Sequence, residues 1–180
     1  MFKKVLIVLA AIIGVILIVA AFQPSAFRVS RSTVVAAPAS TVFSEVNDLH
    51  RWQAWSPYEK VDPAMQRTFE GATTGVGAIY GWAGNNAIGA GKMTIVESRP
   101  PEFIRIKMEF IKPMAGLAEA TFTFVPENGQ TRVTWTMDGN NNYVAKVFCL
   151  FMNMDKMVGG QFEQGLAALK ARTESPAPAK

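Results

Sequence analysis

Residues 103–137, FIRIKMEFIKPMAGLAEATFTFVPENGQTRVTWTM, carry the clearest structural pattern in the chain. In the first nine residues, apolar side chains alternate with charged ones, which is typical of a strand with one buried face. The alternation returns over 118–125 and 131–137, and Glu-Asn-Gly at 127–129 is typical of a tight hairpin turn. We therefore predict consecutive antiparallel strands joined by short turns.

Shorter strand patterns lie towards the N-terminus. Residues 27–35 alternate between apolar and polar side chains, which predicts an opening strand. Three further strands, separated by glycine or proline turns, are predicted at 65–70, 75–82 and 91–98. With the three strands of the C-terminal half, they predict an opening strand followed by a run of about six.

Helical spacing marks the remaining segments. Residues 38–47 predict a short helix, and 48–57, which carry Trp52 and Trp55, predict a turn or a second short helix. Residues 143–171 predict one long helix, because apolar residues recur there at steps of three and four. The members of this stripe are Val144, Val147, Phe148, Phe151, Met154, Val158, Phe162, Leu166 and Leu169.

The C-terminal helix is the only predicted element long enough to cover the apolar face of such a sheet. Gly159 and Gly160 interrupt its stripe, and we expect them to allow close approach to the sheet or to kink the helix. The sequence thus predicts an α+β fold, in which a curved antiparallel sheet wraps around one long helix. The inward-facing side chains would line a cavity between sheet and helix.

An apolar segment precedes this domain. Residues 5–22 contain no polar side chain and would span about 27 Å as a helix, close to the hydrocarbon thickness of about 30 Å. We interpret 1–26 as an N-terminal transmembrane helix with its linker, 27–172 as the folded domain and 173–180 as a disordered tail. The alternative is a secretory signal cleaved after Ala21.

Charges near this segment bear on its orientation. Lys3 and Lys4 favour a cytoplasmic N-terminus. Arg28 and Arg31 follow the segment and oppose this orientation, but we expect them within a strand of the folded domain. We therefore predict a single-pass membrane protein whose domain is extracytoplasmic, and periplasmic if the source is bacterial.

The composition excludes several kinds of site. Cys149 and His50 are the only cysteine and histidine, which leaves no internal disulfide and no cysteine-rich metal site. We expect neither a metal nor a cofactor. The formal net charge of +4 is spread along the chain without a basic stripe, so we predict no nucleic-acid partner. The oligomeric state cannot be inferred from these patterns.

Five local motifs follow one another along the predicted domain. They are Ala-Pro-Ala-Ser-Thr-Val-Phe at 37–43, Asp-Leu-His-Arg-Trp-Gln-Ala-Trp-Ser-Pro at 48–57, Gly-Val-Gly-Ala-Ile-Tyr-Gly-Trp at 75–82, Thr-Arg-Val-Thr-Trp at 131–135 and Phe-Glu-Gln-Gly-Leu-Ala-Ala-Leu-Lys at 162–170. In this order they resemble the START-like (SRPBCC) superfamily, in particular its polyketide cyclase/dehydrase and lipid-transport branch. The resemblance implies a helix-grip fold with an internal cavity for hydrophobic small molecules. It implies no single activity, because the superfamily includes lipid carriers, cyclases, hydroxylase domains and chaperone activators.

The predicted cavity lining consists of inward-facing strand side chains, which could equally form an ordinary core. They are Tyr80, Trp82, Met108, Phe110, Phe122, Phe124, Trp135 and Met137. Methionine and aromatic side chains make an adaptable lining for an apolar ligand. Polar groups that could orient a ligand are Tyr80, Asn85, Asn86, Asp138 and Asn140. No catalytic residue is predicted.

Three functions remain open at this point. We favour a membrane-anchored protein that binds a hydrophobic small molecule or lipid. The second is a polyketide cyclase/dehydratase-type enzyme, which would need acid or base groups such as Asp138 or Tyr80 in the cavity. The third is a chaperone-activator-like interaction protein, which would expose an apolar patch around Trp52 and Trp55.

Overall fold

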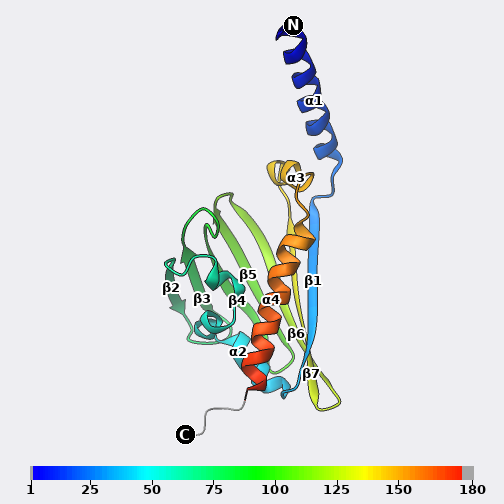
Figure 1. The fold of residues 1–180 in the computed structure, drawn as a ribbon. Helices are drawn as coiled ribbons and strands as arrows, with labels where there is room; N and C mark the ends of the chain where they lie inside the picture. Colours follow the sequence, from blue (N-terminus) through cyan, green and yellow to red (C-terminus); the bar gives the residue numbers. More distant parts are fainter. Residues whose placement is uncertain (1, 176–180) are drawn as a thin grey trace.

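Seven antiparallel strands form one curved sheet in the computed structural model, which describes residues 2–175 (Figure 1). They lie in the order β1-β7-β6-β5-β4-β3-β2, so β2 to β7 form a meander and β1 closes against β7. Their bounds are β1 (Ala26–Val35), β2 (Gln66–Gly71), β3 (Ala78–Ala83), β4 (Ala90–Arg99), β5 (Phe103–Lys112), β6 (Gly116–Glu127) and β7 (Gln130–Asn140). The predicted antiparallel sheet is confirmed.

Helix α4 (Met154–Glu174) runs along the concave face of this sheet (Figure 1). Helix α2 (Ala39–Asn47) and the short 3-10 helix η2 (Pro57–Lys60) pack against α4, and a second 3-10 helix, η1 (Leu49–Ala54), packs against α2. This is the predicted α+β arrangement of a sheet wrapped on a C-terminal helix. Because α4 continues to Glu174, it takes in the first two residues of the predicted tail, and 176–180 of that tail lie outside the described residues.

The prediction of one uninterrupted helix over 143–171 is wrong. Helix α3 (Tyr143–Cys149) is separate from α4. Each of the two begins at its own cap, because the Asn142 and Asn153 side chains accept hydrogen bonds from the backbone N–H groups of Ala145 and Lys156, both at 2.9 Å. No residue of α3 is buried, so only the second half of the predicted stripe reaches the core.

Helix α1 (Phe2–Phe22) projects away from the domain beside α3 (Figure 1). Among the described residues it is the one helix that is long and apolar enough to cross a membrane. A signal sequence near an N-terminus has the same length and composition.

Strand register places the inward-facing side chains in rows across the sheet. The row nearest the centre of α4 contains Ile104, Phe122 and Trp135. Phe162 of α4 stacks on Trp135 with ring centroids 4.0 Å apart and planes 9° apart, and Trp55 meets the same ring edge-on at 5.9 Å. The core is therefore built around a stack of aromatic rings beneath α4.

The N-terminal half of α4 is attached to β1 through Arg31. Its guanidinium donates to both carboxylate oxygens of Asp155, at 2.9 and 2.8 Å, and to Glu163 at 2.7 Å. Gly159 lies between these acids, and a Cβ there would come within 2.1 Å of Arg31 Nη2. The predicted close approach at Gly159 is confirmed, whereas a Cβ at Gly160 would have nothing within 4 Å.

Substituting Asp155 with asparagine should remove part of the acid sensitivity of the fold. Hydrogen bonds from Arg31 hold the pKa of Asp155 below its usual value. The stability added by a carboxylate with a lowered pKa is fully present above its unfolded value of about 4 and is lost as pH falls through the folded value. We expect the wild-type advantage over D155N in thermal stability to be constant near neutrality and to shrink below about pH 4. An advantage that stays the same down to pH 3 would contradict this assignment.

Candidate functional site

Three of the eight predicted lining residues lie inside the aromatic stack. Phe122, Phe124 and Trp135 are almost fully buried, with 0%, 2% and 3% of their surfaces exposed. Trp52 of η1 and Trp55, the residue that follows this helix, pack against Phe122 at centroid distances of 5.8 and 6.3 Å. Protein side chains thus surround these three residues on the concave face.

The other five predicted residues lie nearer the end of the sheet that carries α3. Tyr80 and Met137 are buried, whereas Trp82, Met108 and Phe110 are only partly buried. The Trp82 ring packs over Gly91 of the next strand and meets the Phe110 ring edge-on at 6.1 Å. We call these five residues the concave-face site.

A polar group borders the concave-face site at its β2–β3 edge. Tyr80 Oη donates to Glu59 Oε1 at 2.6 Å, and Arg67 Nε donates to Glu59 Oε2 at 2.7 Å. Burial, followed by the hydrogen bond to Glu59, raises the pKa of Tyr80, so the phenol stays protonated at neutral pH. The edge therefore presents a neutral phenol beside a carboxylate–guanidinium pair.

Sequence reasoning missed Glu59 and Arg67 at this edge. Arg67 pairs with Trp82 across β2 and β3, so it belongs to the inward-facing row of that strand. Alternation along β2 could have identified Arg67. Glu59 comes from the short helix η2, where no periodic pattern indicates the direction of a side chain.

Four of the five predicted polar residues do not join the site. Asp138 is bound by Arg28 Nε at 2.6 Å across β1 and β7, with both side chains substantially exposed. Asn85 closes its own turn by accepting from the Ala87 backbone N–H at 2.8 Å. Asn86 and Asn140 are exposed, at a turn and at a strand end. Of these five polar residues, Tyr80 alone belongs to the concave-face site.

The expected apolar patch around Trp52 and Trp55 is absent, because both side chains are buried with 4% and 1% exposed. Their indole N–H groups donate to the backbone carbonyls of Val46 and Glu45, at 2.9 and 3.3 Å. These bonds turn the apolar rings inward. This segment therefore lacks the apolar patch that the chaperone-activator alternative would need there.

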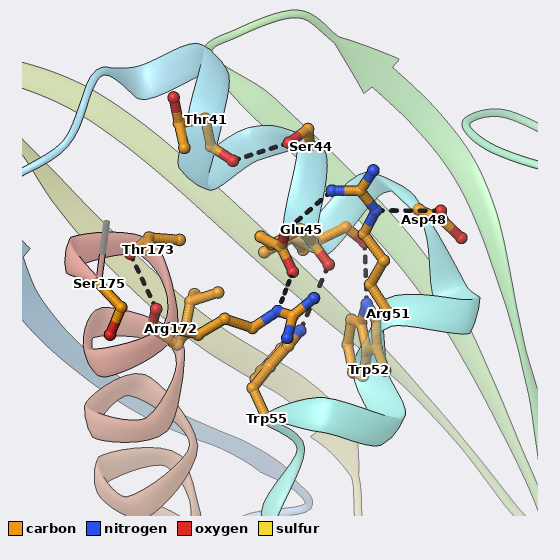
Figure 2. Close-up of polar contacts among 12 residues, drawn as sticks. Thr41, Ser44, Glu45, Asp48, Arg51, Trp52, Trp55, Arg172, Thr173 and Ser175 are labelled. Atoms are coloured by element: carbon orange, nitrogen blue, oxygen red, sulfur yellow. Dashed lines mark hydrogen bonds and ion pairs between the residues drawn. The ribbon is translucent and has the colours of Figure 1, made fainter. Parts of the chain in front are cut away.

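Figure 2 shows a polar cluster centred on the Glu45 carboxylate. Arg51 donates to one oxygen at 2.8 Å, and Arg172 from the end of α4 donates to the other. Arg51 also pairs with Asp48 at 3.2 Å. Both oxygens of Glu45 are thus bound within the protein, and the cluster ties α2, η1 and α4 together.

Two open hollows lie on the described part of the surface. One, of about 240 Å³, is lined by residues of β2, β3 and β4, including Thr68, Lys92 and Trp82 of the concave-face site. The other, of about 550 Å³, lies between the linker after α1 and the turn that joins α3 to α4, and it is lined by Pro24 and Phe151 among others.

The family model for polyketide cyclase / dehydrase and lipid transport matches residues 26–174. The chain belongs to this family. The match covers all seven strands together with α2, α3 and α4, and it excludes α1. No curated protein matches the sequence.

Solved structures share the family fold at low sequence identity. Protein CV1439 from Chromobacterium violaceum has a TM-score of 0.59 and 19% identity, covering 85% of this chain and 100% of its own. The di-domain ARO/CYC BexL from the BE-7585A biosynthetic pathway has a TM-score of 0.61 and 12% identity, covering 88% of this chain and 53% of its own. Aha1 from Colwellia psychrerythraea, solved as a dimer, has a TM-score of 0.55 and 14% identity, covering 82% and 96%. At these identities the likeness shows the fold alone.

Proposed function

We propose that the protein binds a hydrophobic, lipid-like small molecule at the concave-face site and is held at a membrane by α1. The observation that carries this proposal is the partial exposure of Trp82, Met108 and Phe110 on the inner face of the sheet. Aromatic and methionine side chains at such a position supply an adaptable apolar surface that a ligand would cover. Membership of a family described by lipid transport as well as polyketide cyclisation supports the same class of ligand.

The membrane part of the proposal rests on α1. Its 21 residues would span about 31 Å, enough for the hydrocarbon core of a bilayer, and nearly all its side chains are exposed in the fold. Lys3 and Lys4 at its N-terminal end favour an extracytoplasmic domain. A domain fixed beside the bilayer would lie next to the source of an apolar ligand.

Photo-crosslinking of the full chain in phosphatidylcholine vesicles would test the binding site. The probe is a stearic acid that carries a diazirine within its chain, and peptide mass spectrometry locates the crosslinks. We expect them on β3 and β5, at the concave-face site. Met108→Glu should lower the yield there by about tenfold, because the apolar chain would have to lie against an ionised carboxylate.

Val96→Glu is the matched control for this experiment. Val96 lies on β4 next to β5, and its side chain is 43% exposed on the outer face of the sheet. The V96E variant should keep the wild-type yield at the concave-face site. Equal yields in M108E and wild type would show that the ligand does not bind there.

A second candidate function is catalysis of the cyclase/dehydratase type, favoured by the Tyr80–Glu59 pair. The Tyr80 phenol donates a hydrogen bond to the Glu59 carboxylate at 2.6 Å, beside an apolar surface. Such a pair of groups is the kind that general acid–base catalysis uses. Tyr80→Phe separates the two functions. Unchanged crosslinking and no turnover of an aromatic polyketide mimic by the wild type would favour binding. Wild-type turnover that Y80F abolishes would favour the enzyme.

A further inference from the structure

Exposed apolar side chains gather at one end of the domain. Register places Phe110 opposite Gly116, and Ala118 opposite Gly139, so the β5–β6 turn lies at the same end of the sheet as the start of α3. This is also the end that carries α1 (Figure 1). The exposed large apolar side chains here are Ile111, Met114, Leu117, Tyr143, Val144, Phe148, Phe151, Met152 and Met157.

Helix α3 and the turn after it contribute five of these nine residues, and no residue of α3 is buried in the core. Tyr143, Val144 and Phe148 are 47%, 52% and 55% exposed, and Phe151 in the following turn is 71% exposed. A capped helix that leaves its large apolar residues open in this way resembles the helices that lie in a membrane interface. We call residues 143–152 the α3 segment.

The α3 segment is attached to α1. Tyr143 Oη donates to the Leu17 backbone carbonyl at 2.6 Å. Leu17 lies five residues before Phe22, the end of α1, which corresponds to about 7 Å along the helix axis. With the apolar stretch of α1 in a bilayer, Tyr143 would lie at the depth of about 5–10 Å that interfacial helices reach. Tyrosine is also one of the residue types enriched at that level.

Charge at this end suits an anionic lipid surface. Lys112, Lys146 and Lys156 lie in or beside the exposed apolar group, and within residues 2–175 none of them forms an ion pair. The nearby carboxylate of Asp155 is already bound by Arg31. Lysines close to an anionic bilayer surface are attracted to it.

We propose that the α3 segment and the β5–β6 turn lie in the headgroup region of an anionic bilayer. The end of the concave face next to α3 would then lie against the membrane. This inference rests on the proposed membrane location of α1. It adds a second, interfacial contact to the membrane-spanning one. The partly exposed Trp82, Met108 and Phe110 would then face the bilayer side of the domain, and an apolar ligand would pass between lipid and protein without crossing water.

Depth measurement by spin labelling would test the proposal on the full chain. The background variant is Cys149→Ser, which removes the only native thiol. A nitroxide at Phe151→Cys reports on the α3 segment, and one at Gln130→Cys, on the β6–β7 hairpin at the opposite end, is the control. The chain is reconstituted in vesicles of phosphatidylcholine and phosphatidylglycerol. We expect the label at 151 to be open to oxygen and shielded from a water-soluble nickel chelate, and the label at 130 to show the reverse.

Each of the other possible results contradicts a different part of the proposal. Release of the chain by alkaline extraction would overturn the anchor, and with it this inference. A retained chain with both labels open to nickel would overturn the interfacial contact alone. Spin–spin broadening at 151 that disappears on dilution with unlabelled chain would assign the surface to a second copy of the protein. Equal depth at 151 in pure phosphatidylcholine would refute the role of the lysines.

Discussion

Replacing Phe162 with alanine should lower the free energy of unfolding of the domain by about 3–5 kcal/mol. Only 1% of the Phe162 surface is exposed, and its ring lies 4.0 Å from the Trp135 ring in a nearly parallel stack. The substitution removes the apolar area and leaves a cavity that these packed rings cannot close, because Trp135 is also held by Trp55 and Phe122. It is therefore expected to be more harmful than a substitution at an exposed position of α4.

Urea titration of the full chain in a mild detergent, followed by tryptophan fluorescence, would measure this effect. All four tryptophans lie outside α1, so the signal reports on the domain. Phe151→Ala is the matched control, because the same side chain is removed from a position that is 71% exposed. It should change the free energy of unfolding by about 0.5 kcal/mol or less. An F162A loss below about 1 kcal/mol would mean that the aromatic stack is not the centre of the core.

The sheet could be predicted because its pattern is local. Each strand exposes one face, so the alternation in residues 103–137 directly reports which side chains point inward. Short hairpin turns then pair each strand with the next one along the chain, so no long-range pattern is needed to predict these pairings. The strand order of the structure follows from this rule everywhere except at β1, which pairs with β7 across the whole domain.

The break between α3 and α4 was missed because apolar periodicity does not distinguish one apolar environment from another. Phe148 and Phe162 continue the same stripe, yet Phe162 packs in the core and Phe148 is 55% exposed. Asn142 and Asn153 are the local signal that could have separated the helices, since asparagine is a preferred N-cap. Large apolar residues are favoured both in a protein core and in a membrane interface, so residue type alone does not separate the two environments.

The candidate site was less predictable than the fold. Its apolar members follow from strand alternation, which correctly assigns Trp82 and Phe110 to the same face. Alternation cannot say which inward side chains are covered. That depends on Trp52 of η1 and on Trp55 after it, which pack over Phe122 and leave Met108 partly exposed.

Gly165 of α4 provides the second large expected effect. A Cβ at this position would lie 2.9 Å from Pro57 Cδ and 2.9 Å from Trp135 Cζ3, both atoms of rings with little freedom to move. Gly165→Ala should therefore force α4 away from η2 and the sheet, which costs about 1–3 kcal/mol for overpacking. The gain in helix propensity of about 1 kcal/mol offsets only part of this loss.

Gly160→Ala separates packing from propensity within the same helix. A Cβ at Gly160 would have nothing within 4 Å, so this variant keeps the propensity gain and should be more stable than wild type by up to about 1 kcal/mol. Because the propensity term is common to both variants, the difference between their free energies of unfolding measures the packing of α4 on Pro57 and Trp135. Equal stability of G160A and G165A would show that α4 does not lie as close to the sheet as the structure has it. A deficit of about 1–3 kcal/mol in G165A would show that a glycine is required where the helix meets the aromatic stack.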